Sequence, residues 1–375
     1  MADLQELRKT IDTIDTEMVR LFEERMEICK QVAEYKIETG KKVFDKERED
    51  AKISSVSALA HNDLNALGVA ELFGQIMSIS RKLQYGLLAK HGVLEENTFQ
   101  AIDSMDKDNA KVVFQGMEGS YSHAAMKAYF GDNVNNFHVK TFRNAMEAIA
   151  SKEADYAVLP IENSTAGIVS EIYDLLVEFD NYIVGEQIIE IKQCLLGVPG
   201  CKIEEIDGVY SHPQSLMQSA GYLRKFPWKQ ISMENNAFAA KKVADEGDKT
   251  KAAIASKYAG ELYGLEVLAE GVNDQKSNST RFIIVSSKSE FLKSAGKVSI
   301  CFEIPHESGS LYRALSHFIY NGINLCNIES RPIKEKNWEY RFFVDFEGNL
   351  EEDAVKNALN SLKEETQNLV VLGNY

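Results

Sequence analysis

Three cations stand within or beside an apolar stripe near the start of this 375-residue chain. Over residues 4–36, apolar side chains recur every three or four positions, which predicts one long amphipathic helix. Arg25 interrupts the stripe, and Arg8 and Lys36 flank it. Because a buried guanidinium without a partner is costly, Arg25 must meet an anion there. That anion is either a bound ligand or a glutamate of the same domain.

The axial spacing of these cations limits which of them can share a ligand. Arg25 and Lys36 lie nearly on one helix face, about 16 Å apart along the axis, so their long side chains can converge. Arg8 lies about 25 Å from Arg25 along the same axis. If Arg8 serves a site of the same kind, that site belongs to a second copy of the chain, which predicts an intertwined dimer.

Polar residues also interrupt the next two predicted helices. Arg48 and Glu49 lie on the second helix, and Ser80 and Gln84 lie one turn apart in the apolar stripe of the third. Together with the first helix, they predict a polar pocket inside a helical bundle. The alternative is that Ser80 and Gln84 are core residues with satisfied hydrogen bonds.

Four polar loops occur farther along the chain, at residues 116–123, 160–164, 210–214 and 278–282. The first two follow predicted strands, and the last precedes one. The first loop has two glycines and several hydroxyls at the start of a predicted helix, where backbone N–H groups can hold an anion. A tight strand-to-helix turn explains the same residues. The loop lacks the Gly-Lys-Ser/Thr ending of a nucleotide-binding P-loop.

The elements that must position these residues divide the chain into three parts. Residues 1–90 predict an all-α domain with helices at 4–36, about 45–61 and about 69–89. Residues 91–110 are rich in Asn, Asp, Glu and Lys without clear periodicity, which predicts a linker.

Residues 111–287 alternate short β-rich runs with helices, which predicts an α/β part with mostly parallel sheets, as one domain or as two lobes around a cleft. Residues 297–375 follow the order β-α-β-β-α-β of a ferredoxin-like domain. Within it, residues 309–311 open a helix and residues 329–332 end a strand. A capped helix and an edge strand stopped by proline explain both segments without a ligand.

Composition restricts the partners of the chain. A formal net charge of -15 argues against a nucleic acid or an acidic membrane surface, so local cations must capture any anionic substrate. The five cysteines form no CxxC pair and the seven histidines are scattered, which favours a reducing cytoplasm and suggests no metal site. Neither a signal peptide nor a membrane span is predicted.

The helical block resembles the all-helical chorismate mutase family at eight matching positions: Arg8, Arg25, Lys36, Asp45, Arg48, Glu49, Ser80 and Gln84. The resemblance implies an intertwined dimer that rearranges chorismate to prephenate without a nucleophile or cofactor. It implies carboxylate binding by Arg25, Arg48 and Arg8 of the partner subunit. Lys36 and Gln84 would donate to the ether oxygen. Glu49 and Ser80 would hold the ring-hydroxyl side.

The four loops, in this order, resemble those of the prephenate dehydratase family over residues 111–287. The resemblance implies a two-lobed domain that converts prephenate to phenylpyruvate with loss of carbon dioxide and hydroxide. Thr280 would donate to the leaving hydroxyl and Arg281 would bind the side-chain carboxylate. Glu162 is the alternative acid, if its pocket is dry enough to keep it protonated. The implied substrate-binding residues are Ser120, Glu162, Asn163, Ser211, Gln218 and Arg281.

The C-terminal part resembles the ACT regulatory module of prephenate dehydratases. The resemblance implies a phenylalanine site across a dimer interface, with binding that biases the dehydratase towards a less active state. Ser310 stands where the module usually has alanine. The implied effector-site residues are Gly309, Ser310, Leu311, Glu329, Ser330 and Arg331.

Taken together, the resemblances imply a bifunctional enzyme of phenylalanine biosynthesis that forms a homodimer or higher homo-oligomer and is inhibited by phenylalanine. The alternative is a chorismate mutase fused to a non-catalytic two-lobed ligand sensor, against which the Thr280-Arg281-Phe282 tripeptide argues. Fusion to a prephenate dehydrogenase would require a GxGxxG fingerprint after a strand, and the chain has none.

Overall fold

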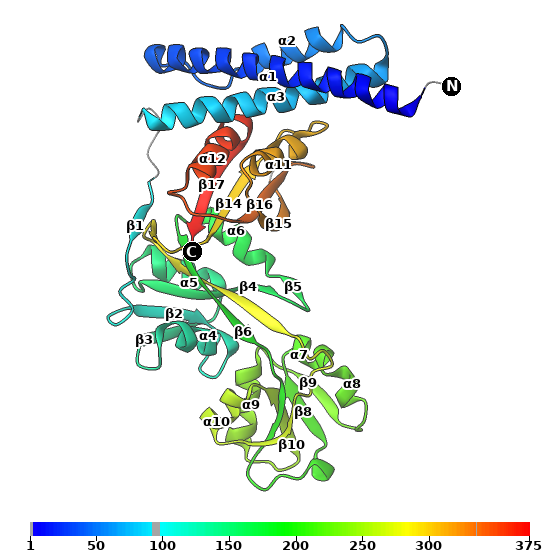
Figure 1. The fold of residues 1–375 in the computed structure, drawn as a ribbon. Coiled ribbons are helices and arrows are strands. Elements are labelled where there is room, and N and C mark those ends of the chain that lie inside the picture. The colour runs from blue at the N-terminus through cyan, green and yellow to red at the C-terminus, as the bar shows by residue number, and fades with distance from the viewer. Residues whose placement is uncertain (1–2, 92–97, 335) are drawn as a thin grey trace. The chain divides into compact units, whose positions relative to one another are not determined.

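The computed structural model describes residues 3–91, 98–334 and 336–375. The chain forms two compact units, of which the first comprises Met1–Thr98 with Gly296–Val371 and the second Phe99–Ala295 with Leu372–Tyr375 (Figure 1). Among the described residues, no helix combines the length and the apolar character needed to cross a lipid bilayer.

Three helices begin the first unit: α1 (Leu4–Thr39), α2 (Lys46–Ser57) and α3 (Asp63–Lys90). All three expected helices are therefore confirmed. The Asp3 side chain caps α1 by accepting from the Gln5 N–H at 3.1 Å. Gly40 ends α1 in the left-handed region with φ of 68°, a conformation that glycine adopts without strain.

The apolar stripe of α1 is open to solvent along the first half of the helix. Leu7, Ile11, Ile14, Met18 and Leu21 are each between 49 and 54% exposed, and the only α1 side chain in the core is that of Ala33, among the described residues. Such a long run of half-exposed leucine, isoleucine and methionine is unusual for a helix without a further partner.

The C-terminal elements of the chain follow the predicted β-α-β-β-α-β order. They are β14 (Lys297–Glu303), α11 (Ser310–Tyr320), β15 (Leu325–Pro332), β16 (Tyr340–Glu347), α12 (Asp353–Glu365) and β17 (Gln367–Asn374). The strands lie in the order β15-β16-β14-β17, which is the ferredoxin-like arrangement. Helix α12 packs against α3 within the first unit. The last residues of β17 belong to the second unit, where Gly373 pairs with Ile183.

The second unit contains two α/β lobes. The first lobe has strands in the order β6-β12-β4-β2-β3, with β5 paired to β4. Its elements are β2 (Lys111–Gln115), α4 (Tyr121–Phe130), β3 (Asn135–Val139), α5 (Phe142–Ala150), β4 (Tyr156–Asn163), β5 (Gly167–Ile168), α6 (Ser170–Glu178), β6 (Tyr182–Glu190) and β12 (Ser279–Ser286). Its core includes the fully buried Phe114, Val158 and Ile284.

The second lobe has strands in the order β11-β7-β10-β8-β9. Its elements are β7 (Cys194–Gly197), a 3-10 turn (Ile203–Glu205), β8 (Gly208–Ser211), α7 (Pro213–Gln218), α8 (Ala220–Leu223), β9 (Lys229–Ser232), α9 (Asn236–Glu246), β10 (Lys251–Ala255), α10 (Lys257–Tyr263) and β11 (Glu266–Glu270). Leu195, Val209 and Ile254 are fully buried in its separate core. Two lobes with two cores settle the alternative that the alternation of elements left open.

The expectation of mostly parallel sheets is wrong, because both sheets are mixed. Strand β2 pairs in parallel with β3 and β4, whereas β12 is antiparallel to both β4 and β6. The chain leaves the first lobe at the end of β6 and returns on β12 beside it. Two neighbouring strands that carry the chain out and back must run in opposite directions.

The expected linker 91–110 is structured in part. Residues 92–97 lie outside the described residues, but β1 (Gln100–Ile102) pairs in parallel with β13 (Glu290–Leu292). The second unit therefore begins at Phe99, before the predicted start at Lys111. A three-residue strand in a polar segment has too little periodicity to be recognised from sequence.

Candidate functional sites

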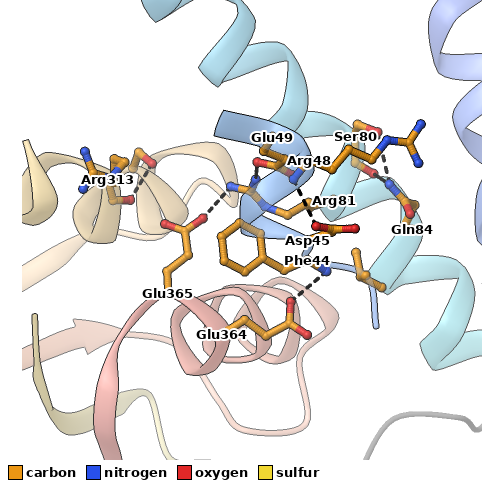
Figure 2. Close-up of polar contacts among 12 residues, drawn as sticks. Phe44, Asp45, Arg48, Glu49, Ser80, Arg81, Gln84, Arg313, Glu364 and Glu365 are labelled. Atoms are coloured by element: carbon orange, nitrogen blue, oxygen red, sulfur yellow. Dashed lines mark hydrogen bonds and ion pairs between the residues drawn. The ribbon is translucent and has the colours of Figure 1, made fainter. Parts of the chain in front are cut away.

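A cavity of about 1040 Å³ lies among α1, α2 and α3. Seven of the eight residues predicted for the helical site line it: Arg25, Lys36, Asp45, Arg48, Glu49, Ser80 and Gln84. Several of them appear in Figure 2. Arg8 is exposed on the first turns of α1 and does not line the cavity, as its axial distance from Arg25 requires.

The cations of this cavity are available to an anion. Among the described residues, Arg25 makes no ion pair with a carboxylate, and its one polar side-chain contact is to the Cys29 sulfur at 3.7 Å. The glutamate partner considered from sequence is therefore not found. The Lys36 Nζ donates to the Val43 carbonyl at 2.7 Å. Burial, and then the nearby charge of Arg48, lower the pKa of Lys36.

Ser80 and Gln84 are both buried, with 5% and 6% of their surface exposed. The Gln84 Nε2 donates to the Ser80 carbonyl and hydroxyl, each at 3.2 Å, whereas Gln84 Oε1 has no partner among the described residues. Buried polar atoms are normally paired, so the unpaired oxygen beside a cavity argues against a merely structural role. The amide can turn towards a ligand and lose only two long hydrogen bonds.

Asp45 and Glu49 stand at the start of α2. The Asp45 side chain caps α2 by accepting from the Arg48 N–H at 3.1 Å. It therefore fixes the first turn of the helix, which carries Arg48 and Glu49. Glu49 forms an ion pair with Arg81 of α3. Arg81 was not predicted as a site residue. Its position between Ser80 and Gln84 put a cation beside the apolar stripe of α3, and this was the available signal.

In the dehydratase part, Thr280 and Asn163 face each other across β12 and β4. The Asn163 Oδ1 accepts from the backbone N–H groups of Thr165 at 3.1 Å and Ala166 at 2.9 Å. Because a backbone N–H can only donate, these bonds fix the orientation of the amide. The Asn163 Nδ2 therefore donates to the Thr280 Oγ1 at 2.9 Å, which leaves the threonine proton available for another acceptor.

Gln218 joins this network from the second lobe. Its Nε2 donates to the Thr165 hydroxyl at 2.7 Å, and its Oε1 accepts from Asn278 at 3.2 Å. Asn278 also accepts from the Asn163 Nδ2 at 2.8 Å. The network thus links the two lobes at the level of Thr280. Thr165 and Asn278 were not predicted as site residues, although each lies two positions from a predicted one.

Arg281 leaves the strand on the face opposite Thr280, because neighbouring strand residues alternate. It lies 3.4 Å from Glu162 and 3.7 Å from Glu186. The Glu162 side chain is 42% exposed, so it lacks the dry pocket that the role of alternative acid requires. The structure places Glu162 and Arg281 together, but on the other face of the sheet from Thr280.

Ser120 and Ser211 lie outside the Thr280 network. Ser120 caps α4 by accepting from the His123 N–H at 3.2 Å. The tight turn considered from sequence is therefore present, with Gly119 at φ of 85°. The buried Ser211 hydroxyl donates to the Ile254 carbonyl at 2.7 Å and lies 3.0 Å from Asn236 Oδ1.

In the C-terminal domain, Gly309 precedes α11 in the left-handed region with φ of 80°, and the α11 residues Ser310 and Leu311 follow. The Ser310 hydroxyl donates to the carbonyls of Pro305 at 2.7 Å and Glu307 at 2.8 Å, so it bonds within its own loop. Residues 329–331 lie on β15, at its end.

Comparison with known proteins agrees with this division of the chain. The chorismate mutase type II model matches residues 7–85, and the prephenate dehydratase model matches residues 112–290.

Among solved structures, one titled a novel type of quorum quenching acylase, GqqA, has a TM-score of 0.65 and 31% identity, over 71% of this chain and 97% of that one. The prephenate dehydratase of Arthrobacter aurescens in complex with L-Phe has a TM-score of 0.66 and 27% identity, over 71% and 89%. These two similarities cover only part of the chain.

The bifunctional chorismate mutase/prephenate dehydratase of Aquifex aeolicus is 35% identical, and the alignment covers 100% of this chain and 98% of that protein. Both catalytic parts are included in that alignment. The chain therefore belongs to the bifunctional chorismate mutase/prephenate dehydratase family.

Proposed function

We propose that the α1–α3 cavity is the mutase site of this bifunctional enzyme and that Thr280 lies at its dehydratase site. The enzyme converts chorismate to prephenate and prephenate to phenylpyruvate. The mutase assignment rests on one observation: within the described part of the chain, the cavity cations make no ion pair with a carboxylate, and chorismate is a dianion.

The Claisen rearrangement of chorismate requires orientation and charge stabilisation. It is unimolecular and transfers no proton, so the protein must hold the dicarboxylate in a compact conformer and stabilise negative charge on the ether oxygen. Arg25 and Arg48 bind the carboxylates together with Arg8 of the partner subunit. Lys36 and Gln84 donate to the ether oxygen, and Glu49 and Ser80 hold the ring hydroxyl.

A second copy of the chain explains both the exposed α1 stripe and the position of Arg8. The half-exposed apolar residues of α1 would pack against the partner, and Arg8 would then reach the partner's cavity. The mutase site is thus completed by a dimer, whereas the Thr280 network is built within one chain.

At the dehydratase site, the electrons of the ring–carboxylate bond form a new ring π bond as carbon dioxide leaves. Hydroxide leaves from the opposite carbon and takes up a proton to become water. Thr280 donates a hydrogen bond to that oxygen, because Asn163 occupies the acceptor side of its hydroxyl. On the family resemblance we assign substrate binding to Ser120, Glu162, Asn163, Ser211, Gln218 and Arg281. Of these six, Asn163 and Gln218 belong to the Thr280 network, and the other four rest on the resemblance alone.

The C-terminal domain is assigned as an ACT module that binds phenylalanine at Gly309–Leu311 and residues 329–331. The L-Phe complex of the Arthrobacter aurescens dehydratase supports this assignment. Ser310 does not obstruct such a site, because its hydroxyl bonds within its own loop. The five cysteines are all free thiols, which supports the reducing cytoplasm as the compartment.

The direct test supplies chorismate to the purified chain and follows chorismate loss and phenylpyruvate formation, with and without phenylalanine. We expect both reactions, and a lower dehydratase rate with phenylalanine. Removing the C-terminal domain would be a poor control, because Gly373 pairs with the dehydratase strand β6. Gly309→Val is cleaner: a β-branched residue strains a backbone with positive φ and should weaken inhibition about tenfold or more without changing the uninhibited rate.

Ser308→Ala is the matched control in the same loop, and we expect it to be inhibited normally. If phenylalanine inhibits Gly309→Val as strongly as the parent enzyme, the effector site lies elsewhere.

A further inference from the structure

Arg81 of α3 is buried between two carboxylates that come from opposite ends of the chain. Its side chain is 8% exposed, and its Nη1 and Nη2 atoms bond different partners. Nη1 donates to Glu49 of α2, and Nη2 donates to Glu365 of α12 at 2.6 Å. Figure 2 shows the guanidinium between the two carboxylates. The fork geometry of arginine suits such a bridge, since a lysine has one nitrogen to offer.

Arg81 contacts residues that line the mutase cavity but does not line the cavity itself. Glu49 and Phe44 line the cavity, whereas Arg81 does not. The guanidinium carbon of Arg81 lies 5.0 Å from the centre of the Phe44 ring, within the range of a cation–π contact. Arg81 therefore touches two residues of the cavity wall without reaching a substrate bound inside it.

Glu365, at the other end of the bridge, is a largely buried carboxylate that needs cationic or donor groups beside it to stay ionised. Glu365 is the last residue of α12, where the helix dipole disfavours negative charge. His317 of α11 lies 3.1 Å from the same carboxylate. Burial would raise the pKa of Glu365, but its close contact with His317 and the charge of Arg81 hold that pKa below its usual value. The carboxylate is thus kept ionised to face Arg81.

A neighbouring contact anchors the same helix end. The Glu364 carboxylate accepts from the Phe44 N–H at 3.0 Å and from the Tyr85 hydroxyl. The last turn of α12 therefore fixes Phe44 through its backbone and Glu49 through Arg81. Both cavity residues at this wall depend on the C-terminal domain.

We propose that Arg81 is a positioning residue of the mutase reaction, which holds Glu49 towards the substrate's ring hydroxyl and is itself held by Glu365 of the C-terminal domain. The inference rests on the proposed role of Glu49 in the mutase site. Its consequence is that the C-terminal domain completes the mutase site as well as binding the effector. A carboxylate released from Arg81 would lose its fixed orientation, and misplacement of a binding group by about 1 Å can cost up to about 100-fold in rate.

The test uses the full-length chain and measures mutase and dehydratase kinetics for each variant. We expect Glu49→Gln and Arg81→Met each to lower mutase kcat/KM about tenfold or more, part of it as a higher KM for chorismate. Partial unfolding of a variant would reduce the amount of active enzyme, which lowers the apparent kcat and leaves KM unchanged. The dehydratase rate should stay unchanged, which shows that the second unit is intact. A cooperative thermal unfolding transition like that of the parent enzyme shows that the first unit is folded.

The double variant distinguishes a role through Glu49 from a separate one. If Arg81 acts through Glu49, then Glu49→Gln/Arg81→Met should be no slower than Glu49→Gln alone, within about twofold. Glu365→Gln should lower mutase kcat/KM about threefold to tenfold, because the fork then loses one of its two anchors. Arg81→Lys should lie between the parent and Arg81→Met.

Lys82→Met is the matched control. Lys82 is the next residue of α3 and also bonds the C-terminal domain, at the Tyr320 carbonyl 2.5 Å away, but Tyr320 does not line the cavity. We expect normal mutase kinetics from it. A similar loss in Lys82→Met would mean that domain contact in general, and not the fork, supports the mutase.

The outcomes separate the two levels of the proposal. Normal mutase kinetics in Glu49→Gln would overturn the proposed site and the inference with it. A defect in Glu49→Gln with normal kinetics in Arg81→Met, or fully additive losses in the double variant, would overturn the inference alone. If Arg81→Met and Arg81→Lys each lost mutase and dehydratase activity to the same extent, Arg81 would stabilise the fold and would have no separate role in the mutase reaction.

Discussion

The two proposed active sites of this enzyme differ in the kind of polar group that they offer to a substrate. Among the described residues, the cations of the proposed mutase cavity make no ion pair with a carboxylate, whereas Thr280 stands in a network of neutral amides and hydroxyls whose donors and acceptors are matched. The first reaction moves charge within one molecule, so fixed positive charge is enough to stabilise its transition state. The second must release hydroxide, so it needs one hydroxyl proton held in a known direction.

Because of this difference, the two sites should be sensitive to different substitutions. A site built on unpaired charge depends on the presence of each cation and on what closes the cavity. A site built on oriented hydrogen bonds depends on the whole chain of partners that fixes one amide, from Gln218 through Thr165 to Asn163. Variants that remove one feature of one site test whether the two sites differ in this way.

The largest expected effect is at Thr280. Thr280→Val keeps the branched shape but removes the hydroxyl, and it should lower dehydratase kcat about 10²- to 10⁴-fold while the mutase is unaffected. Thr280→Ser retains the hydroxyl and should keep most of the rate. Steady-state assays with prephenate and with chorismate measure both. Equal activity of the valine and serine variants would remove Thr280 from the reaction.

Lys36→Ala should abolish mutase activity in practice, with kcat about 10²- to 10³-fold lower, because it removes a donor to the ether oxygen. The dehydratase should be unaffected. Lys30→Ala is the control on the same helix, since Lys30 is exposed and pairs with Glu27. Loss of both activities in a folded Lys36→Ala chain would contradict independent sites.

The proposed dimer distinguishes the sites further, because only the mutase site would be shared. Arg8→Ala and Lys36→Ala should each be nearly inactive as mutases. Mixed and allowed to exchange subunits, they should recover up to about a quarter of the parent activity, since a mixed dimer contains one intact site. Mixtures that recover nothing after proven exchange would place Arg8 in its own chain's site.

The smallest expected effect is on the pH profile. In the proposed mutase site Lys36 acts in its charged form, and its pKa lies below the ordinary lysine value because of burial and the charge of Arg48. Mutase kcat/KM should therefore fall on the alkaline side at a lower pH than an ordinary lysine would give. Glu364, Glu49 and Asp45 act in the opposite direction without cancelling the shift.

Bound chorismate brings two carboxylates to the cavity and should raise the pKa of Lys36, so the kcat profile should fall at a higher pH than the kcat/KM profile. The dehydratase rate over the same range is the control. Coincident profiles would mean that Lys36 does not titrate in the observed range.

Local periodicity explains how much of the fold could be predicted. The three helices of the first unit, and the β-α-β-β-α-β order of the C-terminal part, follow from apolar spacing within windows of a few turns. The mixed direction of the sheets could not be predicted in this way. It depends on how β6 and β12 carry the chain between lobes, a matter of residues about a hundred positions apart.

For the two proposed active sites, the sequence alone shows which residue types are present. Helix geometry adds that Arg8 cannot reach the cavity that contains Arg25 of the same chain. Only the tertiary structure decided which partners these residues have. It oriented the Asn163 amide towards Thr280, 117 positions away. It also joined Arg81 to Glu365, 284 positions away. Such contacts depend on packing between distant segments, for which neither helical nor strand periodicity has a signal.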